Sequence, residues 1–195
     1  MLLNELSRYR IILASASPRR KELLDQMGVV FEVQPLAVVE NFPEKLEGAA
    51  IANYLARLKA DAFDRPLQEN ELLITADTVV WHEGRLLAKP GSPEEAEEML
   101  ASLSDDWHEV ISSVCCTTAE DQRWVHETTL VKFRKLRPEE IRYYVGKFHP
   151  MDKAGAYGIQ EWIGLVGISE ISGSYPNVVG LPTTSLYELL RAMVS

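Results

Sequence analysis

Residues 72 to 81 read Leu72-Leu73-Ile74-Thr75-Ala76-Asp77-Thr78-Val79-Val80-Trp81 and form the clearest strand signal of the chain. The part from 72 to 76 is almost continuously apolar, which is typical of a strand that is covered on both faces. The run continues through Asp77, and residues 82–85 then supply a turn into the short apolar segment 86–88. We therefore expect a buried strand followed by a hairpin.

Shorter segments on both sides of this strand predict an alternation of strands and helices. Hairpin signals beside helix-linked strands favour a mixed sheet, and no repeat, linker or low-complexity tract divides the chain. We therefore expect one α/β domain over residues 1–195, with a mixed sheet flanked by helices. The further strands are expected over 10–15, 108–118 and 123–135 and near 163–171, and the helices over 18–27, 50–64 and 138–147, from Ser92-Pro93 onward and from about Pro182 to the end.

Composition and charge exclude several classes of protein. Hydrophobic residues make up 46% of the chain, which suffices for a full core and excludes a disordered tail or a fibre. Lysine and arginine total 20 against 29 acidic residues, which gives a net charge of −9. Such a chain repels long polyanions and acidic membrane surfaces, so we expect neither a nucleic-acid polymer nor a membrane as partner. A small anion would need a local cationic pocket.

The two cysteines and the first residues bear on the cellular location. Cys115 and Cys116 are adjacent, and a disulfide between neighbours that point to opposite faces of a strand would be strained. Reduced thiols fit the cytoplasm. No run reaches the ~18 apolar residues of a membrane span, and residues 1–15 lack the order of a signal peptide. We therefore expect a cytoplasmic protein.

Three cations open the helix predicted over 18–27. Arg19, Arg20 and Lys21 follow Ser17-Pro18 within one turn. Each cation there should cost roughly 0.3–1 kcal/mol, because the unpaired amides give a helix N-terminus a partial positive charge. A bound anion such as phosphate would explain the exception. The alternative is that the three side chains point to solvent and form surface ion pairs.

Asp77 interrupts a segment that otherwise looks buried on both faces. An isolated buried carboxylate costs several kcal/mol, so it must pair, bind a metal or change its pKa. The alternative is a capping or turn aspartate at the end of the strand. A ligand site is favoured because ligands of α/β sheets bind at strand ends, and both Asp77 and Arg19 follow buried strands.

Further candidates are spread along the chain. Glu40 could supply a second oxygen ligand for magnesium or manganese, or simply face solvent. Lys59 and Lys89 lie near apolar segments, where a lysine is usually just solvated. The segment from Asp152 to Gln160, Asp-Lys-Ala-Gly-Ala-Tyr-Gly-Ile-Gln, lets backbone approach a ligand closely, and Lys153 and Gln160 could reach a phosphate and a base. Its alternative is a tight glycine turn before a strand.

The sequence lacks the motifs of several other classes of enzyme. There is no phosphate-binding loop that ends in Gly-Lys-Ser or Gly-Lys-Thr, no G-x-G-x-x-G fingerprint and no G-x-S-x-G nucleophile elbow. The histidines show no metal-binding spacing, and the cysteines have no evident base beside them. The sequence therefore does not favour acyl transfer or thiol chemistry.

Four segments together resemble one family. In this order they are similar to the Maf family of nucleoside triphosphate pyrophosphatases: Leu13-Ala14-Ser15-Ala16-Ser17-Pro18-Arg19-Arg20, Ala76-Asp77-Thr78-Val79-Val80, residues 152–160, and Gly173-Ser174-Tyr175 with Asn177-Val178-Val179-Gly180-Leu181-Pro182. The resemblance implies hydrolysis between the α and β phosphates, which releases the monophosphate and pyrophosphate in a house-cleaning role. Residues 152–160 resemble the branch that prefers dTTP and UTP, with modified pyrimidine nucleotides as further candidates. The implied fold is similar to that of inosine triphosphate pyrophosphatases, with the nucleotide in a cleft between two lobes, and a homodimer is implied as well.

The resemblance also implies roles for individual residues. Asp77 would be the proton acceptor, and Arg20, Thr78 and Gln160 would shape substrate choice. The other matching positions, expected around phosphate and metal, are Ser15, Arg19, Glu40, Lys59, Lys89 and Lys153. The sequence departs from the family at three positions where glycine, glycine and threonine are usual, and the first two are expected to alter loops only: Ala88, Asp105 and Ser112.

The residue pattern and the resemblance together support one mechanistic hypothesis. Arg19, Arg20 and the helix amides would hold the triphosphate, and a magnesium or manganese ion held by Asp77 and Glu40 would neutralise charge on the phosphoryl oxygens. Lysines 59, 89 and 153 would add positive charge at the leaving pyrophosphate. Asp77 would deprotonate the attacking water, although a metal-bound carboxylate is a weaker base.

Two other functions stay open. A nucleotide-binding regulator of cell division or septum formation would need the cations and amides but no positioned base such as Asp77. A small-molecule phosphatase would release orthophosphate as its direct product. An assay that separates pyrophosphate from orthophosphate at catalytic turnover distinguishes all three functions.

Overall fold

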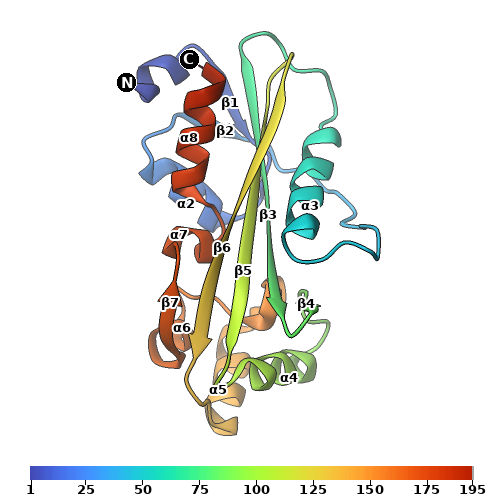
Figure 1. Ribbon diagram of the computed structural model, residues 1–195, viewed down its shortest axis with the longest axis vertical. Helices are drawn as coiled ribbons and strands as arrows, with labels where there is room; N and C mark the ends of the chain where they lie inside the picture. Colours follow the sequence, from blue (N-terminus) through green and yellow to red (C-terminus); the bar gives the residue numbers. More distant parts are fainter. Residues whose placement is uncertain (195) are drawn as a thin grey trace.

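A seven-stranded mixed β-sheet runs through the length of the molecule (Figure 1). The computed structural model describes residues 1–194. The strands are β1 (Arg10–Leu13), β2 (Phe31–Val33), β3 (Glu71–His82), β4 (Arg85–Leu87), β5 (Trp107–Thr117), β6 (Gln122–Phe133) and β7 (Ile168–Ser172). The α-helices are α1 (Leu2–Leu6), α2 (Pro18–Gln26), α3 (Ala49–Asp61), α4 (Pro93–Leu103), α5 (Pro138–Phe148), α6 (Trp162–Gly167), α7 (Tyr175–Val179) and α8 (Thr183–Val194). Two short 3-10 turns, η1 (Pro150–Asp152) and η2 (Ala154–Ala156), lie between α5 and α6.

The strands combine parallel and antiparallel pairing. Their order is β2-β1-β3-β5-β6-β7, and β4 pairs with β3 outside this path. β1 runs parallel to β2 and β3, whereas the remaining pairs are antiparallel. The predicted mixed sheet flanked by helices is therefore confirmed.

Alternate residues of the central strands face different helices. One face carries Ile11, Leu72 and Cys116 against α1, α2 and α8, and the other carries Ile12, Leu73 and Cys115 against α3. Figure 1 shows α8 and α3 on different sides of the long strands. The two-residue period of a strand produces this division. It also explains why the adjacent cysteines are both buried and free.

A separate core fills the other end of the molecule. Phe133 and Tyr144 are fully buried there, among side chains of α4, α5, α6 and α7. Figure 1 shows the two helical ends joined by the long strands β3, β5 and β6. The molecule therefore has two lobes that share one sheet.

One edge of β3 is left open between its partners. β1 is paired with β3 only as far as Leu13 and Ile74, and β4 joins β3 from Val80 onward. On the other side, β5 pairs with β3 without interruption from Leu73 to Trp81. Residues 75–79 of β3 therefore present a free edge between the lobes.

Most predicted elements agree with the structure within a few residues, and one prediction is wrong. The strand expected near 163–171 is a helix, α6, up to Gly167, and only Ile168–Ser172 forms a strand. Ile163 and Gly167 are buried while Leu165 is 79% exposed, which is the burial pattern of a helical turn. Five short elements were not predicted: α1, β2, α7 and the 3-10 turns η1 and η2. No helix within residues 1–194 has the length and apolar content to cross a membrane.

Candidate active site

A pocket of about 900 Å³ lies at the open edge of β3, between the two lobes. Its wall includes all ten site residues that the sequence singled out: Ser15, Arg19, Arg20, Glu40, Lys59, Asp77, Thr78, Lys89, Lys153 and Gln160. Lys21, the third cation of the first turn of α2, is exposed and does not line the pocket. Of the three cations in the turn predicted to bind phosphate, two therefore line the pocket.

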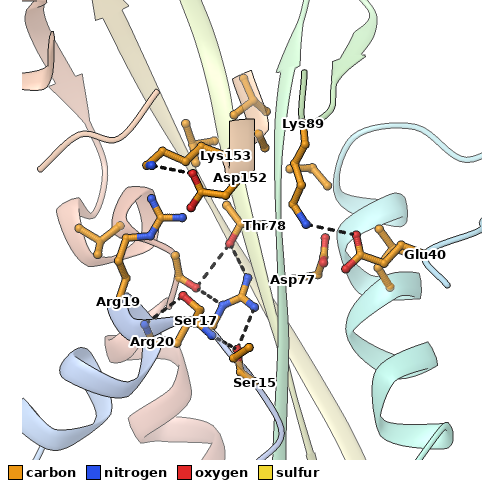
Figure 2. Close-up of a pocket in the computed structure, with 18 of the residues that line it drawn as sticks. Ser15, Ser17, Arg19, Arg20, Glu40, Asp77, Thr78, Lys89, Asp152 and Lys153 are labelled. Carbon is orange, nitrogen blue, oxygen red and sulfur yellow. Dashed lines mark hydrogen bonds and ion pairs between the residues drawn. The ribbon is translucent and has the colours of Figure 1, made fainter. Parts of the chain in front are cut away.

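Arg20 lies where α2 begins, and its side chain turns inward. Ser17 is the N-cap of α2, and its Oγ accepts a hydrogen bond from the backbone N–H of Arg20. The guanidinium donates to the carbonyl of Gly180 at 2.9 Å and to Oγ1 of Thr78 at 3.1 Å. Figure 2 shows this group between Ser15 and Thr78. Burial lowers the pKa of Arg20, and among residues 1–194 no carboxylate forms an ion pair with it within 4.0 Å, so its charge remains available for an anion.

Asp77 lies on the side of β3 that faces α3. The hydroxyl of Thr75 donates to the carbonyl of Ala56, which fixes α3 against the strand. Lys59, one turn further along α3, places its Nζ 2.6 Å from Oδ1 of Asp77. Burial raises the pKa of Asp77, and the nearby Lys59 and Arg20 oppose this shift. The buried carboxylate of Asp77 is therefore paired and has a shifted pKa, two of the three possibilities that its burial left open.

Glu40 and Lys89 complete this side of the pocket. Oε1 of Glu40 lies 2.8 Å from Nζ of Lys59, and Oε2 lies 3.8 Å from Nζ of Lys89. Partial burial alone would raise the pKa of Glu40, but the two lysines hold it below its ordinary value. Figure 2 shows Glu40, Lys89 and Asp77 on one side of β3 and Arg19, Arg20 and Lys153 on the other.

Thr78 belongs to a buried hydrogen-bond network that the sequence did not reveal. Its Oγ1 lies 2.8 Å from Oγ of Ser112, which donates to the backbone carbonyl of Asn177. The fully buried side chain of Asn177 accepts from the N–H of Ser112 and donates to Val110 and to a threonine of β6. The sequence identifies the segment 173–182 only by its resemblance. In the structure this segment holds Arg20 through the carbonyl of Gly180 and holds Thr78 through Ser112 and Asn177.

The segment 152–161 forms the wall contributed by the other lobe. Gly155 and Ala156 both have positive φ, 67° and 57°, so the chain turns sharply after Lys153. Nζ of Lys153 lies 2.7 Å from Oδ1 of Asp152 and 3.1 Å from Oε1 of Glu161. Gln160 is exposed at the pocket wall. A sharp turn at Gly155 and Ala156 brings these side chains to the pocket, and the helix α6 follows it, not the strand of the alternative interpretation.

The carboxylates of Asp77 and Glu40 are arranged in a way that fits a divalent cation. Both contact one nitrogen, Nζ of Lys59, so a single point lies within reach of both. Magnesium is usually held by one or two carboxylates together with waters and substrate phosphates. Within residues 1–194 no group of three or more His, Cys, Asp or Glu could hold a metal. The two carboxylates therefore fit a metal that a phosphate ligand helps to hold, provided that Lys59 moves aside.

The fold and the pocket together define a class of protein. It is a two-lobed α/β protein whose interlobe pocket combines five cationic side chains with four carboxylates, and this set suits a small phosphorylated ligand. The chain belongs to the Maf-like protein family, whose model matches residues 10–193.

Close relatives cover the whole chain. A protein of Bacteroides thetaiotaomicron named dTTP/UTP pyrophosphatase is 52% identical over 98% of this chain and 100% of its own length. One of Flavobacterium johnsoniae with the same name is 46% identical over 100% of both chains. Among solved structures, "The structure of the Staphylococcus aureus Ham1 protein" aligns with a TM-score of 0.47 and 15% identity, over 94% of this chain and 99% of that one.

Proposed function

We propose that this protein hydrolyses dTTP and UTP to the nucleoside monophosphate and pyrophosphate, as a house-cleaning enzyme of the nucleotide pool. The proposal is supported by full-length relatives named for that activity and by membership of the family. It is also supported by a pocket that gathers cations against the net charge of −9.

The observation that carries the proposal is the position of Asp77. Asp77 is 6% exposed, lines the pocket and forms an ion pair with Lys59. A protein that only sensed a triphosphate would need the cations but would gain nothing from a buried carboxylate that repels the ligand. A carboxylate with a raised pKa can accept a proton from an attacking water, so Asp77 favours an enzyme over a sensor.

The triphosphate would lie across the open edge of β3. Arg20 and Arg19, together with the amides that begin α2, would hold phosphate oxygens on one side. The lysines at 59, 89 and 153 would neutralise the charge that develops on the departing pyrophosphate. Asp77 would orient a water for attack at the α phosphorus and take up its proton. Every one of these groups lines the same pocket.

A divalent metal, Mg²⁺ or Mn²⁺, would be held by Asp77 and Glu40. When bound, it supplies positive charge that stabilises the phosphoryl oxygens. Lys59 would then leave the point between the two carboxylates and become free to contact a phosphate. Asp77 would serve both as ligand and as proton acceptor.

Base selection is assigned to Gln160 and Thr78. The amide of Gln160 can both donate to and accept from the O4 and N3–H edge of uracil or thymine. Thr78 would act mainly by holding Arg20, because its Oγ1 accepts from that guanidinium. A methyl group changes binding by only ~1–3 kcal/mol, so uracil and thymine should be poorly distinguished, whereas purines should be rejected more strongly by their size.

The test is a panel of nucleoside triphosphates with magnesium or manganese, in which pyrophosphate and orthophosphate are measured separately. Asp77→Asn is expected to lower turnover at least about a hundredfold and to leave nucleotide binding intact. Asp25→Asn, which changes an exposed residue of α2 outside the pocket, is the matched control. Undiminished turnover in Asp77→Asn would remove Asp77 from the mechanism, and orthophosphate as the direct product would identify a phosphatase instead.

We further propose a cytoplasmic location and a homodimer. Two buried, free cysteines support a reducing compartment. The homodimer follows from family likeness alone, and sedimentation at micromolar concentration would test it.

A further inference from the structure

Lys153 is the cation of the pocket that is held by two carboxylates of its own lobe. Its side chain is 11% exposed, and its Nζ lies 2.7 Å from Asp152 and 3.1 Å from Glu161. The Asp152 side chain is 70% exposed, whereas that of Glu161 is 26% exposed. Solvent screens the ion pair with Asp152 more strongly, so Glu161 is the better-sheltered partner.

Glu161 is itself fixed to the core of its lobe. The hydroxyl of Tyr144, a fully buried residue of α5, donates to Oε2 of Glu161. The same hydroxyl accepts the backbone N–H of Gly158 at 3.0 Å. Burial and the neighbouring Glu161 carboxylate raise the pKa of Tyr144, so its hydroxyl keeps the proton that it donates. The two oxygens of Glu161 thus connect the core to Lys153.

The backbone beside Glu161 is shaped for this contact. A Cβ on Gly158 would lie 2.9 Å from Cδ of Glu161, so a side chain at that position would displace the carboxyl group of Glu161. The N–H of Glu161 donates to the carbonyl of Gly158, which closes the turn. Gly158 therefore allows the carboxyl group of Glu161 to lie against the backbone while it contacts Lys153.

We propose that Glu161 is a positioning residue, held by Tyr144, that keeps the ammonium group of Lys153 directed at the phosphates of the substrate. This inference rests on the proposed nucleotide pyrophosphatase function. A free lysine samples many rotamers, and holding it in one of them avoids an entropic cost when substrate binds. Glu161 also lines the pocket, and its proposed role is exerted through the ion pair with Lys153.

The first test is a double-mutant cycle. We expect Glu161→Gln to lower kcat/KM for dTTP about tenfold in the otherwise unchanged protein. In a protein that already carries Lys153→Met, the same substitution should change kcat/KM less than about twofold, because the ammonium group that Glu161 holds is absent. Glu170→Gln, an exposed change on β7 outside the pocket, should have no effect in either background. Equal losses in both backgrounds, no loss, or a gain in kcat/KM would overturn the proposal.

The second test does not depend on turnover. Acetylation of lysines by a brief pulse of acetic anhydride, read by mass spectrometry, measures how freely each amine reacts. Lys153 should react several-fold faster in Glu161→Gln than in the unchanged protein or in Glu170→Gln, while Lys59 should not change. Tyr144→Phe should also increase the acetylation rate of Lys153. This second variant keeps the test valid if Glu161→Gln fails to fold. An unchanged Lys153 rate in both variants would refute the positioning role. Absence of pyrophosphate release from the unchanged protein would refute the proposed function alone.

Discussion

Glu71 begins β3 with a fully buried side chain, and two arginines neutralise its charge. Arg65 contacts both carboxylate oxygens at 2.6 and 2.8 Å, and Arg10 adds a contact at 3.0 Å. The hydrogen bonds from Arg65, with one from the backbone of Gln68, lower the pKa of Glu71 from 4.5 to about 2. These ion pairs join the first residue of β3 to β1 and to the loop that precedes β3.

Replacement of Glu71 should therefore weaken the fold in a pH-dependent way. Glu71→Gln is expected to cost about 1.5–3 kcal/mol near neutral pH, the usual value for hydrogen bonds to a charged group. Because the folded pKa is lowered, the stabilisation is complete above about pH 4.5 and is lost as the pH falls through about 2. Urea unfolding at pH 7, 4.5 and 3 checks this, with the exposed Glu69→Gln as control. If the difference in the free energy of unfolding between Glu71→Gln and the unchanged protein is as large at pH 3 as at pH 7, the ion pairs of Glu71 do not cause it.

Asp105 shows the cost of departing from a family pattern at a single position. It stands where the resemblance expects glycine, and its φ is +66°, a conformation that costs most residues roughly 1–2 kcal/mol, aspartate less, and glycine nothing. Asp105→Gly should therefore raise stability by about 0.5–1 kcal/mol, seen as an upward shift in Tm. Glu120→Gly, at an exposed turn residue without positive φ, should lower it. Equal effects of the two substitutions would show that backbone strain is not involved.

At the scale of the element, the turn over 154–156 sets the position of the wall that carries Lys153. Gly155 has a φ of +67°, and a Cβ there would lie 3.0 Å from Cγ1 of Val80 on β3. We expect Gly155→Ala to destabilise the protein by about 1–2 kcal/mol and to raise KM for dTTP by displacing Lys153. Gly146→Ala is the matched control, because a Cβ at that helical position of α5 meets no atom within 4 Å and should stabilise the helix. An equal change in stability and in KM for the two variants would show that the turn at Gly155 does not position Lys153.

Elements with a strong local signal could be predicted from the sequence. Ser17-Pro18 and Ser92-Pro93 begin α2 and α4 as expected, because cap and proline are local features. The strand predicted near 163–171 was wrong because a short apolar run fits a strand or a helical turn equally well. Its helical form depends on distant packing, since Gly167 lies against Phe133 and Leu136.

The site was predictable in its members but not in its contacts. The buried Asp77, the cations of α2 and the resemblance at 152–160 identified residues that do line one pocket. The contact of Lys59 with Asp77 required the placement of α3 against β3, and the link from Tyr144 to Glu161 required the packing of α5. Sequence spacing carries no information on either.

At the scale of the whole molecule, the two lobes explain how an acidic protein can bind a polyanion. The chain carries a net charge of −9, yet the open edge of β3 brings cations of both lobes into one pocket. One lobe contributes Arg19, Arg20 and Lys59, and the other contributes Lys89 and Lys153. The bond that is broken should therefore lie between the two lobes, with Asp77 beside the α phosphorus.

Hydrolysis of dTTP in water labelled with oxygen-18 tests this claim most directly. Attack at the α phosphorus places the label in the nucleoside monophosphate and leaves the released pyrophosphate unlabelled, and mass spectrometry of both products reads this out. Label is expected in dTMP alone. Label in pyrophosphate, or labelled orthophosphate as the direct product, would contradict it.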